Sequence, residues 1–218
     1  MAASVKVGVL GSGDVGQALG RGLASRGHDV KLASRNPKGK APSAWLFNVK
    51  GTATTGTYEE TARHGEVLVL ATRGAAIEDV IRTAGIRNFA GKLVIDVTNP
   101  LDFQGPTPGL FVGTTDSLGE RIQRLIPEAK VVKAFNTVSN SQMVDPKFAG
   151  GAPSMLIAGN DAAAKKTVVG ILKDFGWPGA LDVGGIEAAR WLEALVPLWV
   201  LAGTGIGRWD HAFKVVHG

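Results

Sequence analysis

A glycine-rich turn between a strand-like run and an amphipathic segment constrains the fold of this chain more than any other feature. The apolar run Val5–Leu10 comes first, the motif GSGDVG follows at Gly11–Gly16, and apolar residues then recur at four-residue spacing over Val15–Leu23. A second strand-like run starts near Asp29. This order of strand, glycine turn, helix and strand predicts a β–α–β unit. In such units the first glycine permits a tight turn, the second lets a pyrophosphate approach the backbone, and the third lets the helix pack on the strand.

The glycine motif has the chemistry of a phosphate-binding turn. Backbone amides and the positive end of the following helix dipole attract the charge of a pyrophosphate. A GxGxxG motif alone is a weak signal, but a preceding strand and a following helix are the context that a dinucleotide site requires. The residues predicted to hold the pyrophosphate are Gly11, Ser12, Gly13, Asp14, Val15 and Gly16.

The end of the second predicted strand lacks the acidic residue that is typical of NAD sites. That acid normally bonds the 2′-hydroxyl of the ribose. Here Asp29 stands at the start of the strand, and its end carries Ser34 and Arg35, with Lys38 and Lys40 just beyond. An arginine can pair with a 2′-phosphate, and a serine can donate a hydrogen bond to it. The sequence therefore predicts NADP(H) rather than NAD(H).

Short apolar runs alternate with helix-length segments along the whole chain. The runs show no alternation, which is typical of strands buried on both faces. The repeated order predicts an α/β fold, with a Rossmann-type doubly wound parallel sheet and a C-terminal helical or α/β extension. Helix signals include a capping box at Ser117 and Glu120, and a cap at Asn160 for a helix ending near Gly176. The predicted strands are Val5–Leu10, Val30–Ala33, Val67–Ala71, Leu93–Val97, Val131–Phe135, Met155–Ala158 and Ala180–Val183.

The C-terminal part of the chain is predicted to be a cap rather than a separate domain. We expect residues 1–218 to form one dinucleotide-binding domain, with about 180–218 as the cap. Its last helix is expected at about Ile186–Ala202, where it could also serve as a dimer element.

Polar residues follow three of the predicted strands. Because ligands bind beyond the carboxyl ends of parallel strands, these residues are candidates to line the coenzyme and to orient its nicotinamide amide. A turn or cap role explains any single Thr or Asn equally well. Asp96, inside a strand segment, is predicted to bond backbone amides rather than to act as a base. The candidates are Thr72, Arg73, Asn99, Pro100, Asn136 and Thr137.

Composition excludes several other kinds of chemistry. The chain has no cysteine, its four histidines lack the spacing of metal ligands, and it contains no GxSxG motif. We therefore predict no metal site and no catalytic acid, base or nucleophile. The net charge of +5 comes from scattered lysines and arginines. That pattern disfavours nucleic acid, and it suits an anionic small ligand as well as a plain basic protein.

The sequence favours a cytoplasmic protein without a membrane partner. The N-terminal residues lack the basic and apolar regions of a signal peptide. The longest apolar stretch, Ala194–Gly207, is predicted to be a buried helix end and a turn, because about 14 residues are too few to span a bilayer. The expected partner is a small-molecule redox compound, and a homodimer remains open.

Six stretches carry a resemblance to a known family: GSGDVGQALGRGLASRGHDV, LASRNP, IDVTNPL, VVKAFNTV, IAGND and WLEALVPLW. In these stretches the chain resembles the oxidoreductases that pass hydride between NADP and the deazaflavin coenzyme F420. The reductase domains of the six-transmembrane metalloreductases are similar too. The stretches cover nearly the whole chain in the family's order, and VVKAFNT and AGND are more specific than the glycine turn.

The resemblance implies roles for individual residues. It implies that Ser12–Val15 hold the pyrophosphate, that the serine and arginine after the second strand hold the 2′-phosphate, and that Asn136 and Thr137 lie near the nicotinamide. It also implies that the C-terminal region helps to shape the acceptor pocket. The chain departs from the family after the strand that ends at Ala71, where members often have a proline and a bulky residue and this chain has Arg73-Gly74.

The residues and the resemblance together predict an NADP(H)-dependent oxidoreductase whose acceptor is coenzyme F420 or a flavin such as FMN or FAD. Hydride transfer between two stacked rings needs orientation more than acid–base help. Two alternatives remain: an NADPH-dependent reductase of an ordinary flavin or a small carbonyl compound, and an NADPH-binding or sensing module without turnover. Trp209 and His211 are candidate walls of the acceptor site, although a packing role explains Trp209 equally well.

Overall fold

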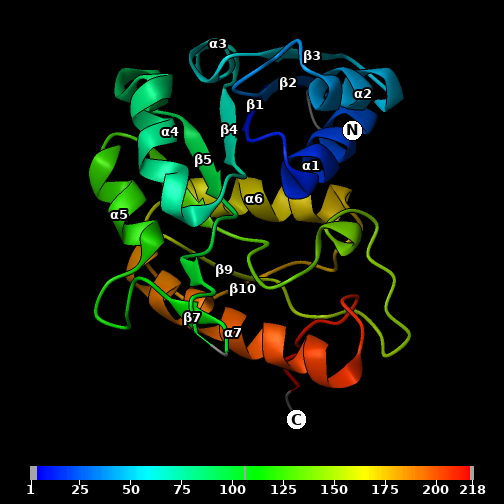
Figure 1. The fold of residues 1–218 in the computed structure, drawn as a ribbon, viewed down its shortest axis with the longest axis vertical. Coiled ribbons are helices and arrows are strands. Elements are labelled where there is room, and N and C mark those ends of the chain that lie inside the picture. The colour runs from blue at the N-terminus through cyan, green and yellow to red at the C-terminus, as the bar shows by residue number, and fades with distance from the viewer. Residues whose placement is uncertain (1–3, 106, 217–218) are drawn as a thin grey trace.

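A mixed eight-stranded sheet forms the centre of the molecule (Figure 1). The computed structural model describes residues 4–105 and 107–216. Strands β3, β2, β1, β4, β5 and β8 run parallel in that order, and β9 and β10 extend the sheet beyond β8. The strands are β1 Lys6–Leu10, β2 Asp29–Ala33, β3 Ala53–Gly56, β4 Val67–Leu70, β5 Leu93–Asp96, β8 Lys130–Lys133, β9 Leu156–Gly159 and β10 Leu181–Asp182.

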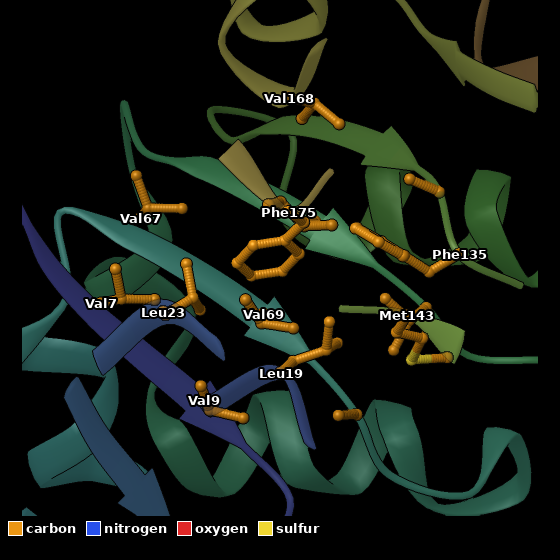
Figure 2. Close-up of a cluster of buried hydrophobic side chains, with 14 of the residues drawn as sticks. Val7, Val9, Leu19, Leu23, Val67, Val69, Phe135, Met143, Val168 and Phe175 are labelled. Carbon is orange, nitrogen blue, oxygen red and sulfur yellow. The ribbon is translucent and has the colours of Figure 1, made fainter. Parts of the chain in front are cut away.

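Helices cover both faces of the sheet. One apolar cluster joins the strands to Leu23 of α1 and Val168 of α6 (Figure 2), and a second joins them to Ile81 of α4 and Ile122 of α5. This two-sided core confirms the predicted Rossmann-type doubly wound fold. The helices are α1 Asp14–Ser25, α2 Lys40–Asn48, α3 Tyr58–His64, α4 Ile77–Ala84, α5 Leu118–Leu125, α6 Ala162–Asp174 and α7 Ala189–Ile206, with short 3-10 turns η1 Gly74–Ala76, η2 Ile86–Phe89, η3 Asn140–Gln142 and η4 Ile186–Ala188.

The chain changes direction across the sheet between β1 and β4. It passes from β1 to β2 and β3 on one side, then crosses to β4 on the other, so Leu10 of β1 lies beside Leu70 of β4. In open α/β sheets, ligands bind beyond the carboxyl ends of the strands at such a switch. Gly11 follows β1 and Thr72 follows β4 at this edge, which is where the sequence analysis expected a coenzyme.

The sheet is not wholly parallel, which corrects one expectation. β9 runs antiparallel to β8, with Val132 opposite Gly159, and β10 runs parallel to β9. In the connection of residues 134–155 the only helical segment is the short turn η3. A β9 parallel to β8 would have to start at the opposite end of the sheet, so the chain would first have to return along the full length of β8. The connection does not return: β9 starts at the end of the sheet where β8 finishes, and the two strands therefore run antiparallel.

Three short strands were missed by the sequence analysis. β3 has the sequence Ala-Thr-Thr-Gly, and as an edge strand it does not carry the continuous apolar run of a buried one. β6 (Leu101–Asp102) and β7 (Gly109–Leu110) form a small antiparallel hairpin within the loop after β5.

Two predicted helix caps differ in detail. The cap of α6 is Asp161, whose Oδ1 accepts a hydrogen bond from Ala164 N at 2.7 Å, whereas Asn160 Oδ1 accepts one from Ile186 N. At α5, Ser117 caps the helix as expected, with its hydroxyl accepting from Glu120 N at 3.0 Å. The Glu120 carboxylate accepts from the Ser117 hydroxyl rather than from its backbone amide, so the reciprocal half of the predicted box is absent.

The last helix is longer and more exposed than predicted. α7 continues through Pro197 to Ile206, and Leu198 and Leu201 are 55% and 46% exposed, so the prediction of a buried helix end and a turn is wrong. Among the residues that the structure describes, no helix combines the length and the apolar character needed to cross a membrane.

Candidate functional site

The three glycines of the turn have different surroundings. At Gly11, φ is +138° and a Cβ atom would clash with the Ala71 carbonyl oxygen. At Gly16 a Cβ atom would clash with the Gly11 carbonyl oxygen. Gly13 has φ −76°, and no atom lies within 4 Å of the position that its Cβ would take. The fold itself requires Gly11 and Gly16, whereas the open space at Gly13 suits the close approach of a ligand.

We expect Gly11→Ala to destabilise the protein by about 2–5 kcal/mol, the combined scale of left-handed backbone strain and of an overpacked contact. Gly13→Ala is the matched control, because its backbone suits alanine and its Cβ meets nothing. Urea denaturation of the two variants measures the difference. Equal unfolding midpoints would contradict this explanation of the turn.

The start of α1 and the end of β4 provide groups that fit a dinucleotide. Gly13 is the N-cap of α1, and no side chain caps the first turn of that helix. Thr72 Oγ1 is buried without a hydrogen-bond partner among the described residues. Because a buried hydroxyl without a partner is costly, an external acceptor or donor at this edge would stabilise it. The residues present therefore fit the predicted coenzyme.

The predicted 2′-phosphate residues lie next to this turn. Leu10 at the end of β1 pairs with Ala33 at the end of β2, so Ser34 and Arg35 leave the sheet beside the glycine motif. The Ser34 hydroxyl is half-buried and accepts a hydrogen bond from Asn36 N at 3.2 Å. The side chains of Arg35 and Lys38 are exposed, and neither forms an ion pair with any residue in the described ranges.

The strand-end asparagines are brought together. Asn99 Nδ2 donates to the Asn136 carbonyl oxygen at 2.9 Å, and Asn136 Nδ2 donates to Asn99 Oδ1 at 3.2 Å and to the Leu192 carbonyl oxygen at 2.7 Å. Asn136 is only 6% exposed. The residue before it, Phe135, has a φ of +60°, which is uncommon for a bulky side chain and marks a sharp turn at the end of β8. This turn places Asn136 between Asn99 and α7.

The remaining strand-end candidates differ in exposure. Pro100 is buried, Thr137 is half-buried and Arg73 is exposed. Gly74, which follows Arg73 at the departure from the family pattern, lies so close to the Asn99 carbonyl oxygen that a Cβ atom would clash with it. Glycine at 74 thus lets the loops after β4 and β5 pack together.

A fully buried lysine lies beneath this edge. Lys133 Nζ donates to Asp96 Oδ2 at 2.8 Å, to the Thr98 carbonyl oxygen at 2.6 Å and to Glu193 Oε1 at 2.7 Å. Burial disfavours the charged amine, but the carboxylates of Asp96 and Glu193 outweigh it and hold the pKa of Lys133 above its usual value. As predicted, Asp96 bonds a backbone amide, that of Thr98.

Glu193 connects this lysine to two helices. Its carboxylate, 2% exposed on α7, accepts hydrogen bonds from Leu118 N at 2.8 Å and Gly119 N at 3.0 Å, at the start of α5. The positive end of the α5 dipole therefore supports the carboxylate. The surrounding helices are further joined by Arg190 of α7 and Glu120 of α5, through hydrogen bonds of 2.8 and 2.6 Å.

The structure does not bring the predicted acceptor residues to the asparagine pair. His211 stacks on Trp199 with ring centroids 4.5 Å apart, and Trp209 lies 5.8 Å from the same ring. A Cβ atom on Gly203 would meet both side chains. At about 1.5 Å of rise per residue, Gly203 lies about 16 Å along α7 from Leu192. Trp209 and His211 thus fold the tail onto the far end of α7, and their role toward an acceptor stays a prediction.

Known proteins match the chain over nearly its whole length. A crystal structure from Arthrobacter sp. FB24, provisionally named an F420-dependent NADP reductase, is 40% identical with a TM-score of 0.93, over 98% of this chain and 100% of that one. The F420-dependent NADP reductase of Methanothermobacter marburgensis is 30% identical over 90% of this chain and 91% of its own. Residues 6–100 match the family described as "NADP oxidoreductase coenzyme F420-dependent". The chain belongs to this F420-dependent NADP oxidoreductase family.

Membership in the F420-dependent NADP oxidoreductase family confirms the predicted family and the enzyme class of NADP-dependent oxidoreductase. The rat metalloreductase STEAP3 is also similar, at 33% identity over 89% of the chain. The chain spans only 38% of that relative's length.

The sequence analysis did not predict the buried ion cluster formed by Lys133, Asp96 and Glu193. Lys133 stands in the otherwise apolar run VVKAF, and a lysine within a strand predicted to be buried was a usable signal. Its partners lie 37 and 60 residues away, so no local pattern could identify them.

Proposed function

We propose that the protein transfers hydride between NADP(H) and a deazaflavin of the coenzyme F420 type, or a flavin. The observation that carries the coenzyme preference is Arg35, exposed beside the glycine turn where an NAD site has an acid. The names of the Arthrobacter and Methanothermobacter relatives support F420 as the acceptor.

In this proposal, three groups of residues hold the coenzyme. The amides of Gly11–Gly16 at the start of α1 bind the pyrophosphate, and Thr72 Oγ1 gains its missing partner there. Ser34, Arg35 and the nearby lysines bind the 2′-phosphate. The asparagine pair after β5 and β8 orients the nicotinamide, whose C4 supplies or receives the hydride.

A ring acceptor suits this edge better than a carbonyl compound. Reduction of a carbonyl leaves an alkoxide that a general acid must protonate. The carboxylates of Asp96 and Glu193 are buried and bonded to Lys133, so neither is free for that role. Transfer between two flat rings instead requires the chain to stack them and to exclude water.

An apolar concavity shares one residue, Leu192, with the surroundings of the asparagine pair. A concavity of about 320 Å³ is lined by Leu156, Val183, Trp191, Leu192 and Leu195. Leu192 contributes both to this surface and, through its carbonyl oxygen, to the Asn136 contact. This arrangement supports an apolar ring beside α7 more than one at the distant tail.

Oxidation of NADPH, followed at 340 nm with F420, FMN or FAD as acceptor, tests the proposal. We expect turnover with F420 or a flavin, and little with simple aldehydes or ketones. Turnover with carbonyl compounds alone would favour the carbonyl reductase alternative. Tight NADPH binding without turnover of any acceptor would favour the binding module.

We expect Asn136→Leu to lower kcat about 100-fold while raising the Kd of NADPH by no more than about tenfold, because misplacing the nicotinamide harms the transition state most. Asn48→Leu on the exposed surface of α2 is the matched control. Steady-state kinetics and fluorescence titration measure the two constants. Equal losses of kcat and of affinity would contradict a role at the nicotinamide.

A further inference from the structure

The buried ion cluster and the asparagine pair form one connected network. Asp96 and Asn99 stand at the end of β5, Lys133 and Asn136 at the end of β8, and Glu193 on α7. We propose that Lys133, Asp96 and Glu193 are positioning residues, which align the nicotinamide end of NADP(H) by fixing Asn99 and Asn136 against α7. This inference rests on the proposed function.

Neighbouring residues link the two parts of the network. Lys133 bonds the carbonyl oxygen of Thr98, the residue before Asn99. Glu193 bonds Lys133 at 2.7 Å, and the preceding carbonyl oxygen, that of Leu192, accepts from Asn136 at 2.7 Å. A shift of the lysine or of α7 would therefore move an asparagine directly. Thr98 and the cluster are buried, so water cannot easily replace these bonds.

The charge balance of the cluster ties it to a third element. Two carboxylates face one ammonium group, which leaves one excess negative charge. The amides of Leu118 and Gly119 at the start of α5 bond Glu193 and offset that charge. Glu193 is thus fixed from two sides, by β8 and by α5, and it holds α7 in one place relative to the sheet.

Such a cluster is better suited to fixing geometry than to adding stability. Apolar residues of similar volume often stabilise a core as well as a buried ion pair does, because removing charges from water is costly. The apolar clusters on both faces of the sheet already provide a core. Apolar packing does not fix a single alignment of the two strand ends with α7. Directional hydrogen bonds to three elements do fix it.

The test compares NADPH with 2′-phospho-ADP-ribose, which keeps the adenosine end and lacks the nicotinamide. Glu193→Gln leaves the Lys133–Asp96 pair neutral overall. Lys133→Met/Glu193→Gln keeps the original net charge of the cluster. We expect both variants to bind 2′-phospho-ADP-ribose with the Kd of the wild type. The ratio of the Kd for 2′-phospho-ADP-ribose to the Kd for NADPH should fall about tenfold. The fluorescence emission spectrum of NADPH bound to these variants should also move toward the spectrum of free NADPH.

Glu128→Gln is the control, since Glu128 is exposed in the turn before β8, at the opposite edge of the sheet. It should match the wild type in both titrations. An unchanged ratio of the two affinities in both cluster variants would overturn the positioning role. Loss of the fold in both variants, judged by circular dichroism, would also overturn it, because the cluster would then hold the whole domain. If the wild type binds neither ligand, the proposed function itself fails.

Discussion

Replacing Gly13 with valine is expected to abolish NADPH binding and to leave the fold intact. No atom lies within 4 Å of the position of the missing Cβ, and a backbone with φ −76° and ψ −179° suits any L residue. Because valine is a poorer N-cap than glycine, the free energy of unfolding should fall, but by no more than about 1 kcal/mol. The valine methyl groups would fill the space through which a pyrophosphate reaches the amides of α1, so the Kd of NADPH should rise at least about 100-fold.

Isothermal titration and urea denaturation of the same preparation separate the two effects. Gly170→Val is the matched control, because Gly170 is exposed on α6 and its Cβ also meets no atom. This control should bind NADPH like the wild type. Full NADPH affinity in a folded Gly13→Val variant would remove the phosphate assignment of the glycine turn.

Arg35→Asp is expected to weaken NADPH binding by about 2–3 kcal/mol, a factor of roughly 30 to 150, and to spare NADH. The change removes a charge-assisted bond and sets a carboxylate against the 2′-phosphate. The wild type should bind NADPH more tightly than NADH. Because Arg35 is exposed, salt should reduce the difference between the two coenzymes.

Arg87→Asp makes the same change in net charge at an exposed position of η2, before β5 and away from the coenzyme edge. It should alter the Kd of NADPH by less than about twofold. Titrations at two salt concentrations compare both variants. Equal affinity of the wild type for NADPH and NADH would defeat the 2′-phosphate interpretation.

Much of the fold was predictable because its strands are buried on both faces. A run such as Val67–Leu70 must be apolar throughout, so it stands out from the helices around it. The edge strand β3 lacks this signal, since residues such as Thr54 remain exposed. The direction of β9 was not predictable, because it depends on the path of the connecting residues 134–155 and not on the composition of the strand itself.

The candidate site shows the same division between local and distant information. The requirement for glycine at 16 follows from its approach to Gly11 within one β–α unit, and sequence spacing indicated it. The close approach of Gly11 is to Ala71 after β4, which the spacing alone does not show. The bonds of Asn136 to Asn99 and Leu192 join residues 37 and 56 positions apart, so they follow only from the folded structure. The exposed faces of α7 were missed because apolar composition does not distinguish a buried helix from one with uncovered sides.

The network around Glu193 divides the site into two parts with different origins along the chain. The turn, Thr72 and the residues after β2 all belong to the first 75 residues, whereas the alignment of the strand ends depends on a helix that starts at residue 189. In the proposed function, coenzyme choice and ring alignment therefore depend on different segments of the chain. A replacement of α7 in such a protein would therefore need a carboxylate that reaches Lys133, if the alignment of the two strand ends is to be kept.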